Sequence, residues 1–196
     1  RLMQDAIHEG ASELELSQSS SLQATRDMLA TLGERYVPKS REGKPANAMF
    51  IPQRPYFPNG SLRDALAYPQ AASSYSDSQL KQALEDALLP NLTGRLDDED
   101  AWSQKLSGGE QQRLAIARVF LKKPAWLFAD EATSALDEAA EKTLYERLLA
   151  QTQQAGGAII SIAHRPAVAA FHDKRWELEK LPEGAPALYE LKESRA

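Results

Sequence analysis

The sequence of 196 residues contains no cysteine, which excludes a disulfide scaffold, a thiol nucleophile and a zinc site with cysteine ligands. Long apolar runs are absent too, since stretches such as Ala125–Ala129 and Ala158–Ile160 are far too short to cross a bilayer. No signal peptide is visible, because the opening residues Arg1–Asp5 precede no apolar run. There is no basic surplus, since 23 Lys and Arg stand against 28 Asp and Glu, which argues against a nucleic-acid binder. We therefore expect a soluble, cytoplasmic domain.

What the sequence does contain is the composition of a folded domain, with 42% hydrophobic and 26% charged residues. Three apolar runs of strand length occur at Met49–Ile51, Trp126–Ala129 and Ala158–Ile162. The last two are typical of strands buried on both faces of a parallel sheet. Between them, Asp137 is placed to cap a helix that ends near Gly156–Gly157. A strand, a helix and a strand in this order predict an α/β architecture.

Two further regions surround this core. One is mostly helical, because Ser61 and Ser76 each fit the start of a helix with a capping box. The acidic run Asp97–Asp100 in this region is predicted to be a solvated loop. The other region closes the chain, where an alternating pattern in Arg175–Lys180 and Ala187–Lys192 predicts an antiparallel pair of strands.

The first chemically informative stretch is a serine followed by two glycines, Ser107-Gly108-Gly109, before a helix that we expect to run to Lys122. Glycines let the backbone approach a ligand closely, and a helix N-terminus presents unpaired N–H groups and the positive end of a dipole. Together these features make a phosphate site. Taken alone, such a turn is more often only a loop and a helix cap, so the assignment depends on the residues that follow.

Polar side chains follow the predicted strands at the points where the strands end. Asp130 and Glu131 come directly after one strand, His164 follows the next, and Gln53 follows the first. In open α/β sheets, ligands bind at the carboxyl ends of the strands. Asp130 suits Mg²⁺ held against nucleotide phosphates, and Glu131 is placed to polarise a water for attack on a γ-phosphate. Gln53 offers an amide oxygen to the metal or the water, so the pattern predicts nucleotide hydrolysis.

The motifs and their order resemble the nucleotide-binding domain of ATP-binding cassette (ABC) transporters between about Met49 and Leu178. The resemblance implies an α/β fold with a RecA-like parallel sheet, an antiparallel β edge and a helical subdomain that carries the signature motif. It makes Leu106–Glu110 that signature and Ser134–Asp137 the D-loop.

The same resemblance implies that ATP and Mg²⁺ are bound. Glu131 and His164 become the catalytic residues, as general base and switch histidine. Gln53 of the Q-loop and Asp130 of the Walker B motif become the metal ligands. The residues implied to contact the nucleotide or its metal are Gln53, Ser107, Gly108, Gly109, Gln111, Asp130 and Asp137.

A narrower resemblance rests on the segment around Gln53. The motifs Ile51–Tyr56, Gly60–Asp64 and Tyr68-Pro69 are similar to those of half-transporters that include the peroxisomal fatty-acyl exporters and bacterial SbmA/BacA-like ATP-binding/permease proteins. This implies a transmembrane domain N-terminal to the chain and a homodimer that holds ATP between its copies, with Ser107–Gly109 reaching across the interface. It also implies a place at the cytoplasmic face of a membrane, in bacteria the inner membrane, and no nucleic-acid partner.

One motif of the family is missing, because the sequence contains no Gly-x-x-x-x-Gly-Lys-[Ser/Thr] phosphate loop. The family places that loop before the Q-loop strand, where the glycines are Gly10, Gly33 and Gly43. Either a segment is missing from the printed sequence near residues 37–41, or a natural or engineered deletion has removed it, and we favour the first. Without the loop and its lysine, we expect the chain to be inactive alone.

Within one ABC domain, the sequence divides into four parts. These are an N-terminal strand and linker region (1–47), the Q-loop strand and loop (48–60), the helical subdomain (61–108), and the signature helix with the later motifs and C-terminal strands (109–196). Two other functions stay open: a catalytically impaired module that binds or regulates, which the missing loop favours, and a soluble ABC ATPase of translation or repair. Members of the latter class generally carry two cassettes or a coiled-coil insertion, and neither is visible here.

Overall fold

The computed structural model describes residues 47–182 and 189–195. The predictions for the N-terminal strand and linker region, and for the place of the missing phosphate loop, lie outside the described residues. The chain divides into two compact units between Ile162 and Ala163. No helix within the described ranges combines the length and the hydropathy that crossing a membrane requires.

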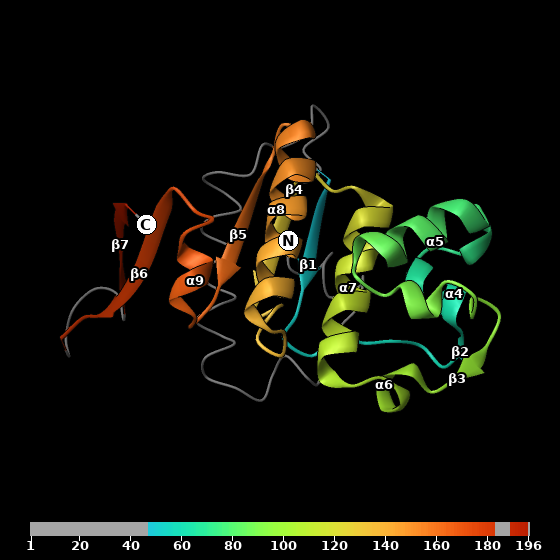
Figure 1. Ribbon diagram of the computed structural model, residues 1–196. Coiled ribbons are helices and arrows are strands. Elements are labelled where there is room, and N and C mark those ends of the chain that lie inside the picture. Colours follow the sequence, from blue (N-terminus) through green and yellow to red (C-terminus); the bar gives the residue numbers. More distant parts are fainter. Residues whose placement is uncertain (1–46, 183–188, 196) are drawn as a thin grey trace. The chain divides into compact units, whose positions relative to one another are not determined.

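The first unit is built on a parallel sheet, which among the described residues has three strands in the order β1-β4-β5 (Figure 1). The strands are β1 (Ala48–Ile51), β4 (Trp126–Asp130) and β5 (Ala158–Ile162). In the register, Ile51 lies opposite Ala129 and Asp130 lies opposite Ile162, so the carboxyl ends of the strands meet at one edge. The central strand β4 is buried along Leu127–Ala129, as its uninterrupted apolar run predicts.

Two long helices pack against this sheet. One is α7 (Gly108–Lys122), which contacts β1, and the other is α8 (Glu138–Gln154), which contacts β5. α7 ends at Lys122, and its C-cap Lys123 adopts a left-handed conformation directly before Pro124. α8 begins at its N-cap Asp137, whose carboxylate accepts a hydrogen bond from the third residue of the helix. Both helices therefore begin and end within a residue or two of their predicted boundaries.

The region between β1 and α7 is mostly helical, as predicted. Its elements are α4 (Leu62–Ala67), η1 (Ala72–Ser74), α5 (Asp77–Asp86), η2 (Pro90–Leu92) and α6 (Trp102–Lys105). Both α4 and α5 contact α7. The predicted helix starts are confirmed, because the Ser61 and Ser76 hydroxyls each accept a hydrogen bond from the backbone N–H three residues later.

The prediction of a loop for the whole acidic run Asp97–Asp100 was wrong at its second half. Glu99–Asp100 forms the short strand β3, which pairs antiparallel with β2 (Gly60–Ser61). The fully buried Trp102 indole secures this pairing by donating to the Gly60 carbonyl oxygen at 2.9 Å. The partner strand lies far away in the sequence, so the local charge pattern contains no sign of it.

The second unit contains α9 (Pro166–Ala169) and a hairpin of β6 (Lys174–Lys180) and β7 (Tyr189–Arg195). The strands are antiparallel, which confirms the predicted closing pair, and the second strand extends beyond its predicted end at Lys192 to Arg195. Residues 183–188, between the two strands, lie outside the described residues. Glu193 accepts from Lys174 at 2.7 Å and from the Trp176 indole at 3.0 Å, so polar pairs across the strands stabilise the hairpin.

Candidate active site

At the carboxyl edge of the parallel sheet, two of the predicted site residues contact each other. Gln53 lies two residues beyond β1, and Glu131 directly follows β4. Because Ile51 and Ala129 are partners in the register, both side chains emerge at the same end of neighbouring strands. Gln53 Nε2 donates to Glu131 Oε2 at 2.6 Å. This contact leaves the amide oxygen of Gln53 as the atom suited to a cation or a water.

The backbone of Glu131 adopts an unusual conformation. Its φ is +46°, in the left-handed region that residues with a side chain rarely occupy. Its N–H donates to the Ile162 carbonyl oxygen of β5 at 2.8 Å, and its own carbonyl oxygen accepts from the Ser134 N–H at 3.1 Å. Strain of this kind costs about 1–3 kcal/mol and persists only where the surroundings enforce it. The fold therefore determines where the Glu131 carboxylate points.

Asp130 is the last residue of β4 and is half-buried beside Glu131 in the sequence. Its carboxylate and the Gln53 amide oxygen are the hard oxygen donors that Mg²⁺ prefers. Residues 47–182 and 189–195 contain no group of three or more His, Cys, Asp or Glu side chains that could hold a metal by themselves. Mg²⁺ at nucleotide sites needs only one or two protein ligands besides phosphates and waters, so the residues present fit it.

The serine–glycine turn caps the N-terminus of α7. The Glu110 carboxylate accepts from the Ser107 hydroxyl at 2.7 Å and from the Ser107 N–H at 2.9 Å, which completes a capping box. These two hydrogen bonds hold the pKa of Glu110 below its usual value, and the bond from the Ser107 hydroxyl has the larger effect. The N–H groups of the first helical turn, at Gly108 and Gly109, have no partner within the helix and are suited to an anion.

The loop after Glu131 packs against this turn. A Cβ added at Gly109 would lie 3.1 Å from the Ala135 carbonyl oxygen, so a glycine allows the two segments to approach. At the end of the loop, Asp137 Oδ1 accepts from the Ala140 N–H at 2.9 Å, and this hydrogen bond lowers the pKa of Asp137. Capping of α8 is thus the observed role of Asp137, and its contact with a nucleotide stays a prediction.

Two successive glutamines of α7 have different partners. Gln111 Nε2 donates to the Ser103 and Leu106 carbonyl oxygens, both at 2.9 Å, and its predicted nucleotide contact stays a prediction. Gln112, which the sequence analysis did not identify, is only 4% exposed and hydrogen-bonds to the loop after β4. The sequence signal that could have identified it is helical spacing, because Gln112 lies one turn before the buried Ile116.

His164 lies two residues beyond the end of β5 and belongs to the second unit. Its role as a switch histidine stays a prediction. Among the other predicted site residues, two pairs of segments meet. Gln53 contacts Glu131, and the turn at Gly109 packs against the loop that follows Glu131.

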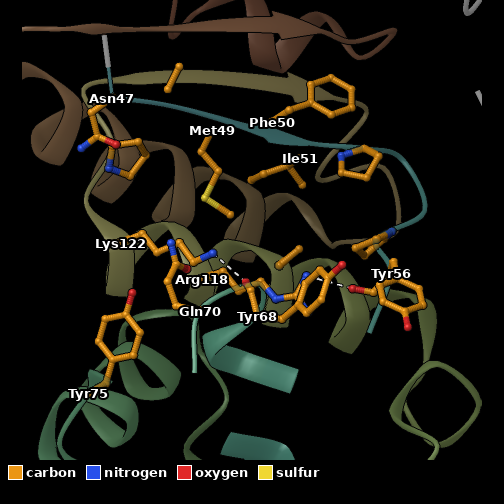
Figure 2. Close-up of a pocket in the computed structure, with 15 residues that line it drawn as sticks. Asn47, Met49, Phe50, Ile51, Tyr56, Tyr68, Gln70, Tyr75, Arg118 and Lys122 are labelled. Carbon is orange, nitrogen blue, oxygen red and sulfur yellow. Dashed lines mark hydrogen bonds between the residues drawn. The ribbon is translucent and has the colours of Figure 1, made fainter. Parts of the chain in front are cut away.

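Beside the Q-loop segment there is a pocket of about 180 Å³ between β1 and α7 (Figure 2). Met49 and Ile51 point toward it from β1, whereas Phe50 lies on the other face of the strand (Figure 2). Tyr56 is also among the lining residues, and it is 47% exposed, the largest exposure of a large hydrophobic residue in the described part of the chain. The lining of the pocket is therefore partly aromatic.

A buried guanidinium forms the floor of the pocket. Arg118 of α7 donates to the Ala65 carbonyl oxygen through Nε at 2.9 Å and Nη2 at 2.6 Å, and to the Tyr56 carbonyl oxygen at 2.9 Å. Its charge lies 4.5 Å from the centre of the Phe57 ring. Burial lowers the pKa of Arg118 to about 10. Through these contacts Arg118 joins α7 to α4 and to the segment that follows Gln53.

Comparison with known proteins gives concordant results. A family model described as ABC transporter matches residues 11–134. The chain is 44% identical to an uncharacterised ABC transporter ATP-binding protein of Synechocystis sp. over 137 residues, which cover 68% of this chain and 20% of the relative. It is 39% identical over 155 residues to the lysosomal cobalamin transporter ABCD4 of Mus musculus, covering 70% of this chain and 25% of that protein. Against the chloroplastic ABC transporter D family member 2 of Arabidopsis thaliana, the identity is 36% over 170 residues, covering 72% and 24%.

A solved structure also matches: that of a bacterial Atm1-family ABC exporter with ATP bound, at a TM-score of 0.61 and 28% identity, over 77% of this chain and 30% of that chain. The chain spans about a fifth to a quarter of the length of the curated relatives it matches. The family model covers well over half of the chain, including the Q-loop, the signature and the Walker B strand. This chain therefore belongs to the ABC transporter family, with the predicted ABC-type α/β fold and with relatives among the D-family half-transporters.

Proposed function

We propose that this chain is the ATP-binding and ATP-hydrolysing module of a membrane transporter. The observation that carries the proposal is the 2.6 Å contact between Gln53 and Glu131 at the carboxyl edge of the sheet. A carboxylate in this position, fixed by its backbone and by a neighbouring amide, is suited to orient a water and accept its proton as the water attacks the γ-phosphate.

The other residues have supporting roles in this proposal. Mg²⁺, when bound together with ATP, neutralises phosphate charge, and Asp130 and Gln53 would hold it. The N-terminus of α7, at Ser107–Gly109, binds the γ-phosphate of the nucleotide on a second copy of the chain, because unpaired N–H groups and the helix dipole favour an anion there. For His164, of the copy that holds the nucleotide, the role is that of the switch histidine, which the family resemblance implies. Hydrolysis then requires two copies to close on the nucleotide.

The partner that makes this module a transporter is a transmembrane domain of a longer protein. Curated relatives of the chain are four to five times as long as the parts that match it, and their names describe transporters. The pocket beside Tyr56, partly aromatic and adjacent to Gln53, provides a docking surface for that domain. The chain would then lie at the cytoplasmic face of a membrane, which in a bacterium is the inner membrane.

The missing phosphate loop gives weight to a second candidate, an impaired module that cannot bind ATP. Peptide sequencing of the natural protein between Tyr36 and Asn47 distinguishes the two. We expect additional residues there that include Gly-x-x-x-x-Gly-Lys-[Ser/Thr]. A continuous peptide matching the printed sequence would instead support the impaired module and the inactivity of the chain alone.

ATP hydrolysis by the purified full-length protein tests the proposed activity. We expect Glu131→Gln to lower the rate of phosphate release by about 100-fold or more while the affinity for ATP stays within about twofold, because the variant removes a base and keeps the shape. Glu85→Gln, at an exposed acid of α5, is the matched control and should leave the rate unchanged. Equal rates for the wild type and Glu131→Gln would reject the role of Glu131. Absence of ATP binding in the wild type would reject the proposed function.

A further inference from the structure

Gln112 is a polar side chain in an almost fully buried position. It lies in the second turn of α7, and only 4% of its surface is exposed. Its amide nitrogen donates to the Glu131 carbonyl oxygen at 3.1 Å and to the Ser134 hydroxyl at 3.0 Å. Its amide oxygen accepts from the Ala135 N–H at 2.9 Å. Both hydrogens of the amide and its oxygen therefore bind one short loop, and nothing in this arrangement depends on solvent.

The loop held in this way carries the acid of the proposed reaction. Glu131 needs support because its φ of +46° is unfavourable. Its N–H is bound to β5 through the Ile162 carbonyl oxygen at 2.8 Å, and its carbonyl oxygen is bound by Gln112. The residue is thus held on both sides of its α-carbon. The same carbonyl oxygen also accepts from the Ser134 N–H at 3.1 Å, so Gln112 is one of two donors that hold the backbone from which the carboxylate extends to Gln53.

The same side chain joins two parts of the proposed site. Gln112 lies on the helix whose first turn contains Gly108 and Gly109, and Gly109 packs against Ala135 of the loop. The first two turns of α7 are therefore joined to the loop by a direct packing contact at Gly109 and by the three hydrogen bonds of Gln112. A buried amide whose hydrogen bonds are all satisfied is rigid, because any displacement leaves polar groups without partners.

We propose that Gln112 is a positioning residue for ATP hydrolysis, which fixes the Glu131 backbone and links it to the N-terminus of α7. The proposal rests on the proposed function, because it assigns Gln112 an effect on the acid of that reaction. Gln112 itself touches neither the nucleotide nor the water. Its removal should lower kcat and leave the binding of ATP nearly unchanged, since a displaced base weakens the chemical step alone.

The first test uses Gln112→Glu in the full-length protein. This change keeps the size of the side chain and an oxygen that can accept from the Ala135 N–H. It removes the N–H that donates to the Glu131 carbonyl oxygen and places a carboxylate oxygen beside that carbonyl instead. We expect kcat to fall by about 10- to 100-fold with KM for ATP within about threefold. The control is Gln151→Glu, because Gln151 of α8 also donates to a backbone oxygen of α7, that of Val119, at 3.2 Å. Its kcat should stay within about twofold of the wild type.

A double-mutant cycle with Ser134→Ala distinguishes positioning from a general loss of packing. Ser134 accepts only one of the three hydrogen bonds, so Ser134→Ala alone should lower kcat less than Gln112→Glu does. If both act through one contact network, the double variant should be scarcely slower than Gln112→Glu. The positioning role would be overturned if the decrease in kcat of the double variant equalled the product of the two single decreases. It would also be overturned if Gln112→Glu left kcat unchanged while Glu131→Gln was inactive. Either result leaves the proposed function intact.

Amide hydrogen exchange gives a readout that does not require turnover. In Gln112→Leu, the Ala135 N–H loses its acceptor and should exchange at least about 10-fold faster, whereas Gln151→Leu should leave it unchanged. If Gln112→Leu does not fold, amide exchange of residues 131–135 is measured in Gln112→Glu instead, because this variant loses the hydrogen bond to the Glu131 carbonyl oxygen. Unchanged protection of this loop in both Gln112 variants would refute the inference. Should the wild type fail to hydrolyse ATP, the proposed function fails, and the exchange rates still decide whether Gln112 holds the loop.

Discussion

Replacement of Gly157 by alanine should destabilise the first unit more than any neighbouring change of one methyl group. Gly157 lies between α8 and β5, directly before Ala158. A Cβ built on it would lie 1.7 Å from the Ala125 carbonyl oxygen and 2.4 Å from the carbonyl carbon, where ordinary contacts begin at 3.4 Å. The obstacle is backbone, not a flexible side chain, so the start of β5 has to move by well over an ångström.

The size of the effect follows from the bonds that such a movement strains. The Gly157 N–H donates to the Thr152 carbonyl oxygen at 2.9 Å, and the Ala158 N–H donates to the Ala125 carbonyl oxygen at 3.1 Å. Each hydrogen bond contributes about 0.5–1.5 kcal/mol, and overpacking costs about 1–3 kcal/mol more. The lower entropy of the unfolded alanine chain returns about 0.4–1 kcal/mol. We therefore expect Gly157→Ala to reduce the free energy of unfolding by about 3 kcal/mol, which lowers the Tm by about 10 °C.

Urea unfolding followed by circular dichroism measures this change, and Gly94→Ala is the matched control. Nothing lies within 4 Å of a Cβ at Gly94, and its backbone is not left-handed. The control should leave the free energy of unfolding within about 0.5 kcal/mol of the wild type or raise it slightly. If Gly157→Ala proves as stable as Gly94→Ala, the reasoning is refuted, because the backbone of Ala125 then cannot lie as close to Gly157 as the structure shows.

Two further predictions concern the residues around the site. Arg118→Leu removes three N–H donors, two from the buried Ala65 carbonyl oxygen and one from the part-buried Tyr56 carbonyl oxygen. It should reduce the free energy of unfolding by about 3 kcal/mol or more, and Arg118→Lys should restore only part of this. An unchanged urea midpoint would contradict the prediction. The pKa of Glu110 is lowered from 4.5 by its bonds to Ser107, so its stabilising effect is complete above that value and is lost as the pH falls through the folded-state pKa. Glu110→Gln should therefore show a shallower fall of Tm below about pH 4.5 than the wild type, and identical profiles would disprove the capping contribution.

Features that depend on a few adjacent residues could be predicted from the sequence. The capping box at Ser76, the N-cap at Ser107 and the end of α7 before Pro124 each follow from side chains within four residues of the backbone they act on. The strand predicted at Trp126–Ala129 and observed at Trp126–Asp130 follows from an uninterrupted apolar run, which has few alternatives in an α/β domain. The order of the family motifs then identified the domain, since each motif is a local pattern as well.

Other features depend on residues that meet only when the chain folds. β3 forms because Glu99–Asp100 pairs with Gly60–Ser61, which lies at the other end of the helical region in the sequence. A segment rich in charged residues has no local preference for a strand. Burial of Arg118 was equally unpredictable, because its three hydrogen bonds go to two backbone oxygens, and backbone oxygens look alike in every sequence. Gln112 follows the polar residues Glu110 and Gln111, which are only half-buried, and its own burial depends on which face of α7 packs against the loop after β4.

By itself, the amino-acid sequence determined most of the elements, their approximate boundaries and the types of side chain at the ends of the parallel strands, because propensity, capping and apolar periodicity act over single turns of the chain. Only the tertiary structure decided that Gln53 meets Glu131, that Glu131 adopts a left-handed backbone and that Gln112 supports it. These relations join segments more than eighteen residues apart, and their geometry is set by the packing of β1, β4 and α7 as a whole.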